Sequence, residues 1–338
     1  MNYILNKENE IYYECSWSSD NAVFLKLGEN RYVITDGRYT LEAKEEADAE
    51  VVEARDLVKK ARELILKHRI KSLKIDPLNW DRTSYETLYR AVKLQDVKNL
   101  SHKKRMIKTQ DELEIIKTAV KKGAEAFDAF LKDIETGIDE YELSYRFKKH
   151  LSLRGRRELS FEPIVAINEN SAKPHARVTS KTLKKNDLLL LDAGIKYKRY
   201  CSDRTRTIDI SDSPSMSKFQ KFKDKKMQKV YDTVLKAQLS AIKAVKVGVK
   251  LCELDAIARE VIRKEGYGDF FVHSLGHGVG LDIHEWPYVN SKNETKVKEG
   301  MVFTIEPGIY LPGEFGVRIE DMVLINHDGS VEVLSEEI

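Results

Sequence analysis

Apolar and polar residues alternate over short distances in the first hundred residues, between stretches with a helical repeat. The runs NAVFLKL (21–27) and RYVIT (31–35) are rich in apolar, β-branched and aromatic residues and predict strands. The stretch DLVKKARELILKHR (56–69) gathers its apolar residues on one helical face and predicts an amphipathic helix. This mixture predicts a small α/β domain over residues 1–104.

The pattern changes near residue 103, where a basic connector precedes a long amphipathic stretch. Thr109 begins this stretch, and Glu112 three residues later completes the sequence signature of a capping box. Further helical patterns follow at about 138–152, 226–247 and 252–266, with strands rich in Leu, Ile and Val between and after them. Such runs of helices and hairpins predict an α+β domain with an antiparallel sheet over residues 105–338.

Residues 211–226, SDSPSMSKFQKFKDKK, interrupt this domain with a polar, lysine-rich stretch that contains a proline. A stretch of this kind between a strand and a helix is typical of a solvated surface loop, and we expect one here. A phosphate-binding patch is the alternative interpretation.

Charge and composition limit the classes of function. The 338 residues include 58 basic and 55 acidic side chains, a formal net charge of +3, and such even charge argues against a nucleic acid or a membrane as partner. No stretch approaches the roughly 20 apolar residues of a membrane span, and the N-terminus lacks the pattern of a secretory signal. The three cysteines contain no CxxC pair, which is typical of a reducing compartment. We therefore expect a cytoplasmic protein.

Two acidic residues flank a predicted hairpin in LLLLDAGIKYKRYCSDRTRTIDI (188–210). Asp192 and Asp203 are equally far from the short polar turn Tyr197-Lys198. In an antiparallel ladder without a bulge, such residues lie opposite one another on the same face of the sheet. The alternative is that both are ordinary strand-end or turn residues, but Asp192 follows four leucines, where an unpaired carboxylate is costly to bury.

A second predicted hairpin, MVFTIEPGIYLPGEFGVRIEDMVLI (301–325), repeats this arrangement. Glu306 and Glu320 are equally far from Gly313 in a connection rich in glycine and proline. Both glutamates interrupt apolar strands, so the hairpin predicts a second carboxylate pair. The alternative is a pair of strand carboxylates that form salt bridges with Arg318.

Three of the eight histidines, His273, His277 and His284, lie between the two hairpins in the glycine-rich segment FFVHSLGHGVGLDIHEWP (270–287). Glycines permit close approach of the backbone to a ligand. Four carboxylates and an imidazole form a set rich in hard oxygen ligands, and their four charges would be balanced by two divalent cations. The ligand types favour Mn²⁺, with Co²⁺, Fe²⁺ or Zn²⁺ as alternatives, and paired metals predict hydrolytic chemistry.

These residues resemble the pita-bread metallopeptidases, the family of methionine aminopeptidase, aminopeptidase P, prolidase and creatinase. The matching local motifs are DAG, SDRTRT, GHGVG, EPG and RIED. The resemblance covers about residues 105–338, and TDGRYT (35–40) resembles the N-terminal domain of the aminopeptidase P, prolidase and creatinase branch. It implies a pita-bread catalytic domain, α+β in class, preceded by a smaller creatinase-like α/β domain.

The resemblance also implies the metal ligands. Asp203 and Glu320 would bridge both metal ions, Asp192 would hold one, and His277 with Glu306 would hold the other. Glu306 is in addition the candidate general base.

Further residues resemble the substrate-binding side chains of the family. His175 resembles a histidine near the substrate N-terminus, and His273 and His284 resemble a pair that flanks the scissile peptide and the proline pocket. On this resemblance His284 would donate a hydrogen bond to the tetrahedral intermediate, which Tyr310 and Arg318 would position while they help to move protons. The alternatives are a loop role for His175 and ordinary strand roles for Tyr310 and Arg318.

The substrate prediction rests on one position. Prolidases of this family often carry arginine after the motif HEWP, and arginine suits recognition of a product carboxylate. This chain has Tyr288 there, which favours an Xaa-Pro aminopeptidase acting on peptides with proline at the second position, with prolidase as the alternative. A more distant alternative is a non-catalytic RNA- or protein-binding member of the fold. The family resemblance further implies a homodimer.

Overall fold

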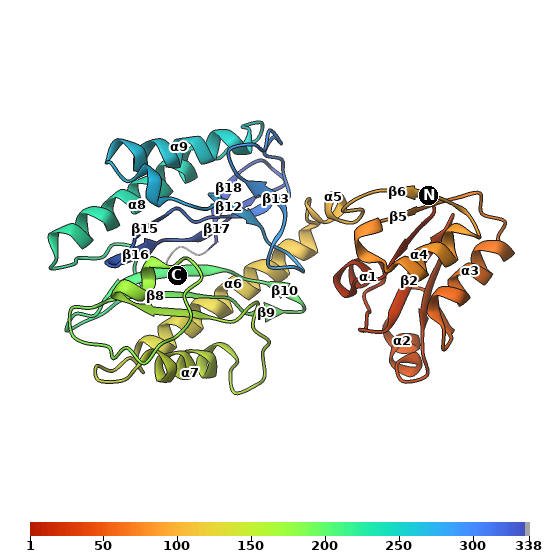
Figure 1. Ribbon diagram of the computed structural model, residues 1–338, viewed down its shortest axis with the longest axis horizontal. Coiled ribbons are helices and arrows are strands. Elements are labelled where there is room, and N and C mark those ends of the chain that lie inside the picture. Colours follow the sequence, from red (N-terminus) through yellow and green to blue (C-terminus); the bar gives the residue numbers. More distant parts are fainter. Residues whose placement is uncertain (335–338) are drawn as a thin grey trace. The chain divides into compact units, whose positions relative to one another are not determined.

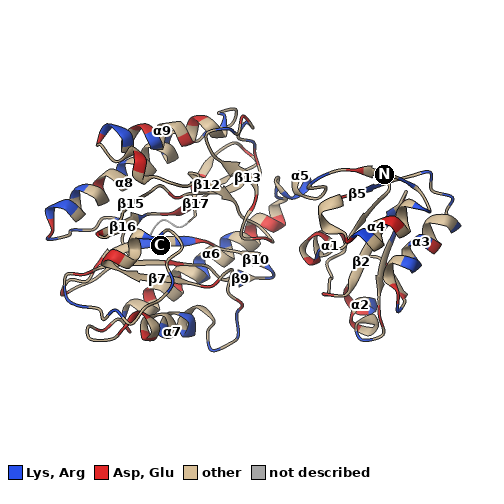
Figure 2. Ribbon diagram, viewed as in Figure 1, with Lys and Arg blue, Asp and Glu red and all other residues tan. Residues whose placement is uncertain are grey.

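The computed structural model describes residues 1–334 and forms two compact units, of which the first is Met1–Arg105 and the second begins at Met106 (Figure 1). The last four residues of the predicted catalytic domain, 335–338, lie outside the described residues. Basic and acidic residues are interspersed in both units, in agreement with the small net charge of +3 (Figure 2). Along residues 1–334, no helix combines the length and the apolar character needed to cross a lipid bilayer.

A mixed six-stranded sheet forms the centre of the N-terminal unit, in the order β4-β3-β2-β1-β5-β6. Its strands are β1 (Tyr3–Leu5), β2 (Ala22–Leu27), β3 (Asn30–Thr35), β4 (Glu50–Glu53), β5 (Ser72–Ile75) and β6 (Lys93–Asp96). The helices are α1 (Glu8–Cys15), α2 (Thr40–Glu46), α3 (Leu57–Lys67), α4 (Arg82–Tyr89) and α5 (His102–Arg105), with a 3₁₀ turn, η1 (Pro77–Asn79). The strands and the amphipathic helix predicted for this region are confirmed as β2, β3 and α3.

Alternation along β2 explains why helices cover both faces of this sheet. Val23 and Leu25 share a buried cluster with residues of α3 and α4, whereas Phe24 between them packs with residues of α1 and α2. Successive side chains of a strand point to opposite faces, so an apolar run needs a helical layer on each side. The predicted α/β class is confirmed for this unit.

The C-terminal unit contains antiparallel sheets and four longer helices. The helices are α6 (Gln110–Leu131), α7 (Glu140–Leu151), α8 (Lys225–Ala244) and α9 (Leu251–Lys264), with 3₁₀ turns η2 (Asn168–Ala172) and η3 (Gly268–Phe270). One sheet has the order β11-β8-β7, formed by β7 (Ile164–Ile167), β8 (Leu188–Ala193) and β11 (Arg204–Asp209). Another has the order β13-β12-β14-β17-β18, formed by β12 (Gly276–Gly278), β13 (Glu285–Val289), β14 (Val302–Ile305), β17 (Asp321–Ile325) and β18 (Val331–Val333). Two-stranded ribbons complete the unit: β9 (Lys196–Tyr197) with β10 (Tyr200–Cys201), and β15 (Gly308–Leu311) with β16 (Phe315–Arg318).

The helices of this unit cover the sheets in two pairs. Residues of α6 and α7 share one apolar cluster with β7, β8 and β11, and residues of α8 and α9 share another with β14 and β17. Figure 1 shows the strands between these two helical layers. The predicted helices at 138–152, 226–247 and 252–266 are confirmed as α7, α8 and α9, and α6 begins with the predicted capping box of Thr109 and Glu112. The predicted α+β class is therefore confirmed.

The first predicted hairpin forms with a register that differs by one residue from the prediction. Its turn is Lys198-Arg199, with φ of 46° and 70°, and Asp192 pairs with Thr205 rather than with Asp203. A two-residue hairpin turn of type I′ needs positive φ at both central residues, and this placement keeps Tyr197 packed against the apolar cluster. Asp203 lies two residues before Thr205, so the carboxylates are diagonal neighbours on one face instead of direct partners.

The second hairpin has the predicted register. The pairs Ile305 with Asp321 and Gly308 with Arg318 place Glu306 opposite Glu320. Gly313, at the predicted centre, has φ of +76°, a conformation that glycine adopts at little cost. The prediction that these two glutamates face one another across the hairpin is confirmed.

Residues 211–226 connect β11 to α8 as predicted, but the prediction of a solvated loop was wrong. Every second side chain in the centre of this segment is buried, namely Met216, Lys218, Gln220 and Phe222. Met216 belongs to the apolar cluster of α6 and α7, and Phe222 belongs to that of α8 and α9. The backbone N–H of Asp209 donates to Gln220 Oε1 at 3.0 Å. The exposed Lys221 and the exposed lysines that follow Phe222 concealed an extended segment with one buried face.

Candidate active site

A cavity of about 530 Å³ in the C-terminal unit gathers nearly all of the predicted site residues. Its lining includes nine of the ten: His175, Asp192, Asp203, His273, His277, His284, Glu306, Arg318 and Glu320. The tenth, Tyr310, is buried behind this lining and contacts His273 and Arg318. The cavity therefore brings together side chains that the sequence spreads over almost 150 positions.

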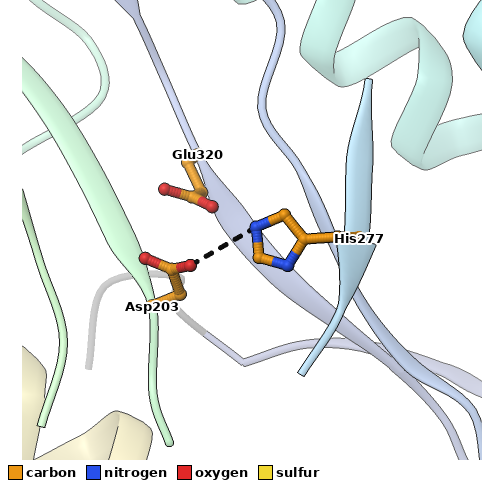
Figure 3. Close-up of side chains that lie close together, drawn as sticks. All are labelled: Asp203, His277 and Glu320. Carbon is orange, nitrogen blue, oxygen red and sulfur yellow. Dashed lines mark ion pairs between the residues drawn. The ribbon is translucent and has the colours of Figure 1, made fainter. Parts of the chain in front are cut away.

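Three of the predicted metal ligands offer atoms within 4.8 Å of one another, and Figure 3 shows Asp203, His277 and Glu320 pointing toward a common point. Asp203 directly precedes β11, His277 lies in β12, and Glu320 directly precedes β17. His277 Nε2 is 3.6 Å from Asp203 Oδ2 and 3.2 Å from Glu306 Oε1. Asp192, in β8, lines the same cavity beside them.

The carboxylates have the properties expected of ligands for cations. Asp192 Oδ1, Asp203 Oδ1 and Glu320 Oε1 are buried and accept no hydrogen bond. Burial and, after it, repulsion from neighbouring carboxylates raise the pKa of Asp203 and of Glu320 well above the ordinary values. An ionised carboxylate in such a place requires a cation nearby, and carboxylate oxygens with one imidazole suit divalent metal ions. These residues therefore fit a divalent metal centre.

The imidazole of His277 is oriented so that one ring nitrogen can bind a metal ion. Its Nδ1 atom lies 3.1 Å from the carbonyl oxygen of Gly278, which can only accept, so Nδ1 carries a hydrogen and Nε2 faces the carboxylates. A backbone acceptor on the outer nitrogen is the usual way in which a metal-binding histidine is held. Burial lowers the pKa of His277, but the hydrogen bond and the charge of Glu306 outweigh it and raise this pKa.

Arg318 connects the first hairpin to the second within the site. Its Nη2 donates to Asp192 Oδ2 at 2.6 Å, and its Nη1 donates to the hydroxyl of Tyr310 at 2.8 Å and to the carbonyl of Pro174 at 3.1 Å. The Tyr310 hydroxyl also lies 2.9 Å from His273 Nε2. Burial raises the pKa of Tyr310 to about 12, although Arg318 opposes this, so the hydroxyl stays neutral at physiological pH.

His284 and His175 lie on the cavity lining outside the carboxylate cluster. The rings of His284 and His277 have centroids 4.3 Å apart and stand at 72° to one another. Burial and the neighbouring His277 lower the pKa of His284, which favours its neutral form. His175 lies between Pro174 and Ala176, which also line the cavity.

Two threonines contact the predicted ligands and escaped the sequence analysis. Thr205 Oγ1 donates to Glu320 Oε2 at 2.7 Å and accepts from Arg318 Nε at 3.1 Å. Thr304 Oγ1 donates to Glu306 Oε1 at 3.1 Å. Each threonine is two residues from a predicted ligand along a strand, so the alternation of side chains already placed it on the same face.

An ion pair supports the Glu320 backbone from the opposite face of these strands. Arg206, only 1% exposed, donates to the Glu320 carbonyl and to Asp321 Oδ1, both at 2.7 Å. Lys218 Nζ lies 3.4 Å from the other oxygen of Asp321, and Gln238 Nε2 donates to it at 3.1 Å. The buried segment 216–222 thus reaches the residue next to a predicted metal ligand.

Comparison with known proteins places this site in a family. The model of metallopeptidase family M24 matches residues 114–327. An Xaa-Pro dipeptidase of Pyrococcus furiosus is 43% identical over 233 residues, which are 69% of this chain and 64% of that protein, and one of Pyrococcus horikoshii is 41% identical over the same shares. The alignment thus spans less than two thirds of the length of these relatives.

Solved structures match over the whole chain. An Xaa-Pro dipeptidase from Bacillus anthracis has a TM-score of 0.90 at 32% identity and covers 100% of this chain and 93% of that one. An X-Pro aminopeptidase from Thermotoga maritima has a TM-score of 0.88 at 32% identity, with coverage of 100% and 96%. These matches confirm the predicted pita-bread fold. With the family model covering most of the chain, this protein belongs to metallopeptidase family M24.

Proposed function

We propose that this chain is a metal-dependent peptidase that hydrolyses Xaa-Pro dipeptides. The observation that carries the proposal is the convergence of four carboxylates and His277 in one cavity, with three buried carboxylate oxygens that accept no hydrogen bond. The relatives named Xaa-Pro dipeptidases support this substrate over the Xaa-Pro aminopeptidase that Tyr288 favours in the sequence.

The proposed metal centre consists of two divalent ions, with Mn²⁺ as the natural metal. Ions bound there would supply Lewis acidity for hydrolysis of the peptide carbonyl. Their ligands would be the five residues Asp192, Asp203, His277, Glu306 and Glu320. Glu306 would also accept a proton from the attacking water, the role that the family resemblance implies for it; its Oε1 lies 3.2 Å from His277 Nε2.

The remaining polar residues of the cavity would bind and orient the peptide. The imidazole of His284 would donate a hydrogen bond to the oxygen that becomes negative during reaction, and Arg318, which holds the Tyr310 hydroxyl, would help to position that oxygen. His273 donates from Nδ1 to the Ser274 carbonyl and accepts from the Tyr310 hydroxyl through Nε2, so its ring would form part of the wall beside the peptide. His175 would lie beside the substrate's N-terminal residue.

One observation favours a second candidate function, an Xaa-Pro aminopeptidase. Tyr288 is 39% exposed and lines the cavity at the position where a dipeptidase would benefit from a cation. Arg318, the guanidinium on the cavity lining, is already paired with Asp192. A longer peptide would not need recognition of a carboxylate after proline, and the similarity to the X-Pro aminopeptidase from Thermotoga maritima agrees with this candidate.

The test compares Xaa-Pro dipeptides, Xaa-Pro-Xaa tripeptides and Xaa-Ala dipeptides, using chelated protein before and after addition of Mn²⁺. We expect Mn²⁺-dependent hydrolysis of Xaa-Pro dipeptides, and a loss of this activity in Glu306→Gln. Cleavage of tripeptides alone would establish the aminopeptidase instead. Inactivity on every peptide, with metal shown to be bound, would contradict both and favour a non-catalytic RNA- or protein-binding role.

Three properties stay predictions from the sequence and family resemblance: Mn²⁺ as the natural metal, a homodimer and a cytoplasmic location. Elemental analysis of protein purified without added metal tests the first. Light scattering tests the second, where the mass of a single 38.9 kDa chain would contradict it. Cell fractionation tests the third.

A further inference from the structure

A fully buried carboxylate outside the metal cluster organises one wall of the cavity. Glu140 is the first residue of α7 and has no exposed surface. Its Oε1 accepts from the backbone N–H of Ile167 at 2.7 Å. Its Oε2 accepts from Asn170 Nδ2 at 2.8 Å, from the backbone N–H of Thr179 at 2.6 Å and from the hydroxyl of Thr179 at 2.7 Å. Four donors and the first turn of a helix therefore stabilise this charge.

These donors come from both ends of one segment, residues 167–179, and from Asn170 near its start. Asn170 Nδ2 also donates to the Arg177 carbonyl at 2.9 Å, which closes the segment on itself. Ser171 Oγ donates to the Gly316 carbonyl at 3.0 Å and accepts from the Gly316 N–H at 2.8 Å, which ties the segment to β16. The carboxylate of Glu140 is thus the common acceptor that determines the shape of the segment.

The central part of this segment faces the cavity. Pro174, His175 and Ala176 line it, and the Pro174 carbonyl accepts from Arg318 Nη1 at 3.1 Å. Glu140 is absent from the cavity lining and so acts only through the segment. We propose that Glu140 is a positioning residue that sets the affinity for the peptide by holding residues 174–176 against it. The effect on peptide affinity rests on the proposed peptidase function, whereas the effect on the structure of residues 167–179 does not.

The test is the substitution Glu140→Gln, which preserves shape and removes the charge. A carboxamide has one oxygen and one NH₂ group, so at least one N–H of the segment would face another donor. Glu142→Gln is the matched control, because Glu142 lies in the same turn of α7 and loses the same charge, but it pairs with Arg146 and is 43% exposed.

The first readout is hydrogen–deuterium exchange of residues 167–179. We expect faster exchange in Glu140→Gln and unchanged exchange in Glu142→Gln, whether or not the protein hydrolyses any peptide. The second readout is kinetic. In Glu140→Gln, residues 174–176 would no longer be held against the peptide, so KM for an Xaa-Pro dipeptide should rise about tenfold or more with kcat changed less. A misplacement of about 1 Å can lower the efficiency of an enzyme by about a hundredfold, which sets the scale of this effect. Metal content should equal that of the wild type.

Equal exchange and equal KM in the two variants would overturn the proposal. A fall in kcat and in metal content with unchanged KM would also overturn it, since this would indicate a general structural defect. If Glu140→Gln does not fold, Thr179→Val removes a single donor and should raise KM in the same direction by a smaller factor. A wild-type protein without peptidase activity would refute the proposed function, while the exchange experiment would still decide the role of Glu140.

Discussion

Replacement of Arg206 by methionine tests the support behind Glu320. The guanidinium donates to Asp321 and to the carbonyls of Met216, Thr205 and Glu320, all in a buried environment. Methionine keeps much of the apolar volume but provides no donor and no charge. The substitution therefore leaves a buried carboxylate and three backbone carbonyls with fewer partners.

The size of the effect follows from what remains around Asp321. Removal of one partner of a buried ion pair costs about 3–5 kcal/mol. Lys218 at 3.4 Å and Gln238 at 3.1 Å still contact the other oxygen of Asp321, so we expect the lower end, about 3 kcal/mol. For a domain of 150–250 residues about 1 kcal/mol corresponds to about 2–4 °C, which gives a fall in Tm of about 6–12 °C.

The effect should depend on pH with a definite sign. Burial alone would raise the pKa of Asp321, but the charges of Arg206 and Lys218 outweigh it and lower this pKa. A carboxyl group with a lowered native pKa contributes stability above its unfolded pKa and loses it as pH falls. The difference in stability between wild type and Arg206→Met should therefore be greatest near neutral pH and should shrink as the solution is acidified below about pH 4.

Thermal and urea unfolding of chelated protein, followed by circular dichroism, measures this difference. Arg263→Met is the matched control, because Arg263 forms an ion pair of similar length with Glu260, at 2.8 Å, but is 68% exposed. An exposed pair contributes at most about 1 kcal/mol, so the control should change Tm by no more than about 4 °C. A fall in Tm for Arg206→Met no larger than that of the control would refute the reasoning.

Further outcomes are expected. Chelation should lower Tm, and added Mn²⁺ should restore it, because ions bound only by the folded state stabilise it; an unchanged Tm after verified metal removal would contradict this. Tyr310→Phe removes the hydroxyl that accepts from Arg318, so kcat/KM should fall about 5- to 150-fold, for a cost of about 1–3 kcal/mol, with metal content unchanged. Burial raises the pKa of Cys15 to about 11 and of Cys201 to about 12. A thiol reagent at pH 8 should therefore modify only the half-buried Cys252 before unfolding, and stability should decline as the pH rises above about 9, where the unfolded thiols ionise.

The local sequence pattern was sufficient to predict much of the secondary structure of the C-terminal unit. The apolar runs and capping signals identify its main helices, and the spacing of Glu306 and Glu320 about Gly313 predicts the register that the second hairpin adopts. These features depend on neighbours in the sequence, such as side-chain alternation along a strand and a turn that tolerates positive φ. The motifs around the carboxylates likewise indicated the family that the comparisons confirm.

Other features depended on contacts between distant parts of the chain. The first hairpin turns at Lys198-Arg199 because Tyr197 packs against the apolar cluster, which the local polarity of the turn does not reveal. The lysine-rich composition of residues 211–226 masked a buried face that contacts Asp209, Asp321 and both apolar clusters of the C-terminal unit. The fully buried Glu140 looks like an ordinary first-turn helix residue until residues 167–179 supply its four donors.

The sequence alone determined which side chains share a face of each hairpin, because strand periodicity is local. Only the tertiary structure decided that the faces of both hairpins and the histidine segment meet in one cavity, where Arg318 reaches Asp192 across 126 positions of sequence. The position of these faces relative to one another depends on how the sheets pack, through the apolar clusters, between the two helical layers. Buried charges then take their partners from whichever segments the packing brings within hydrogen-bonding distance.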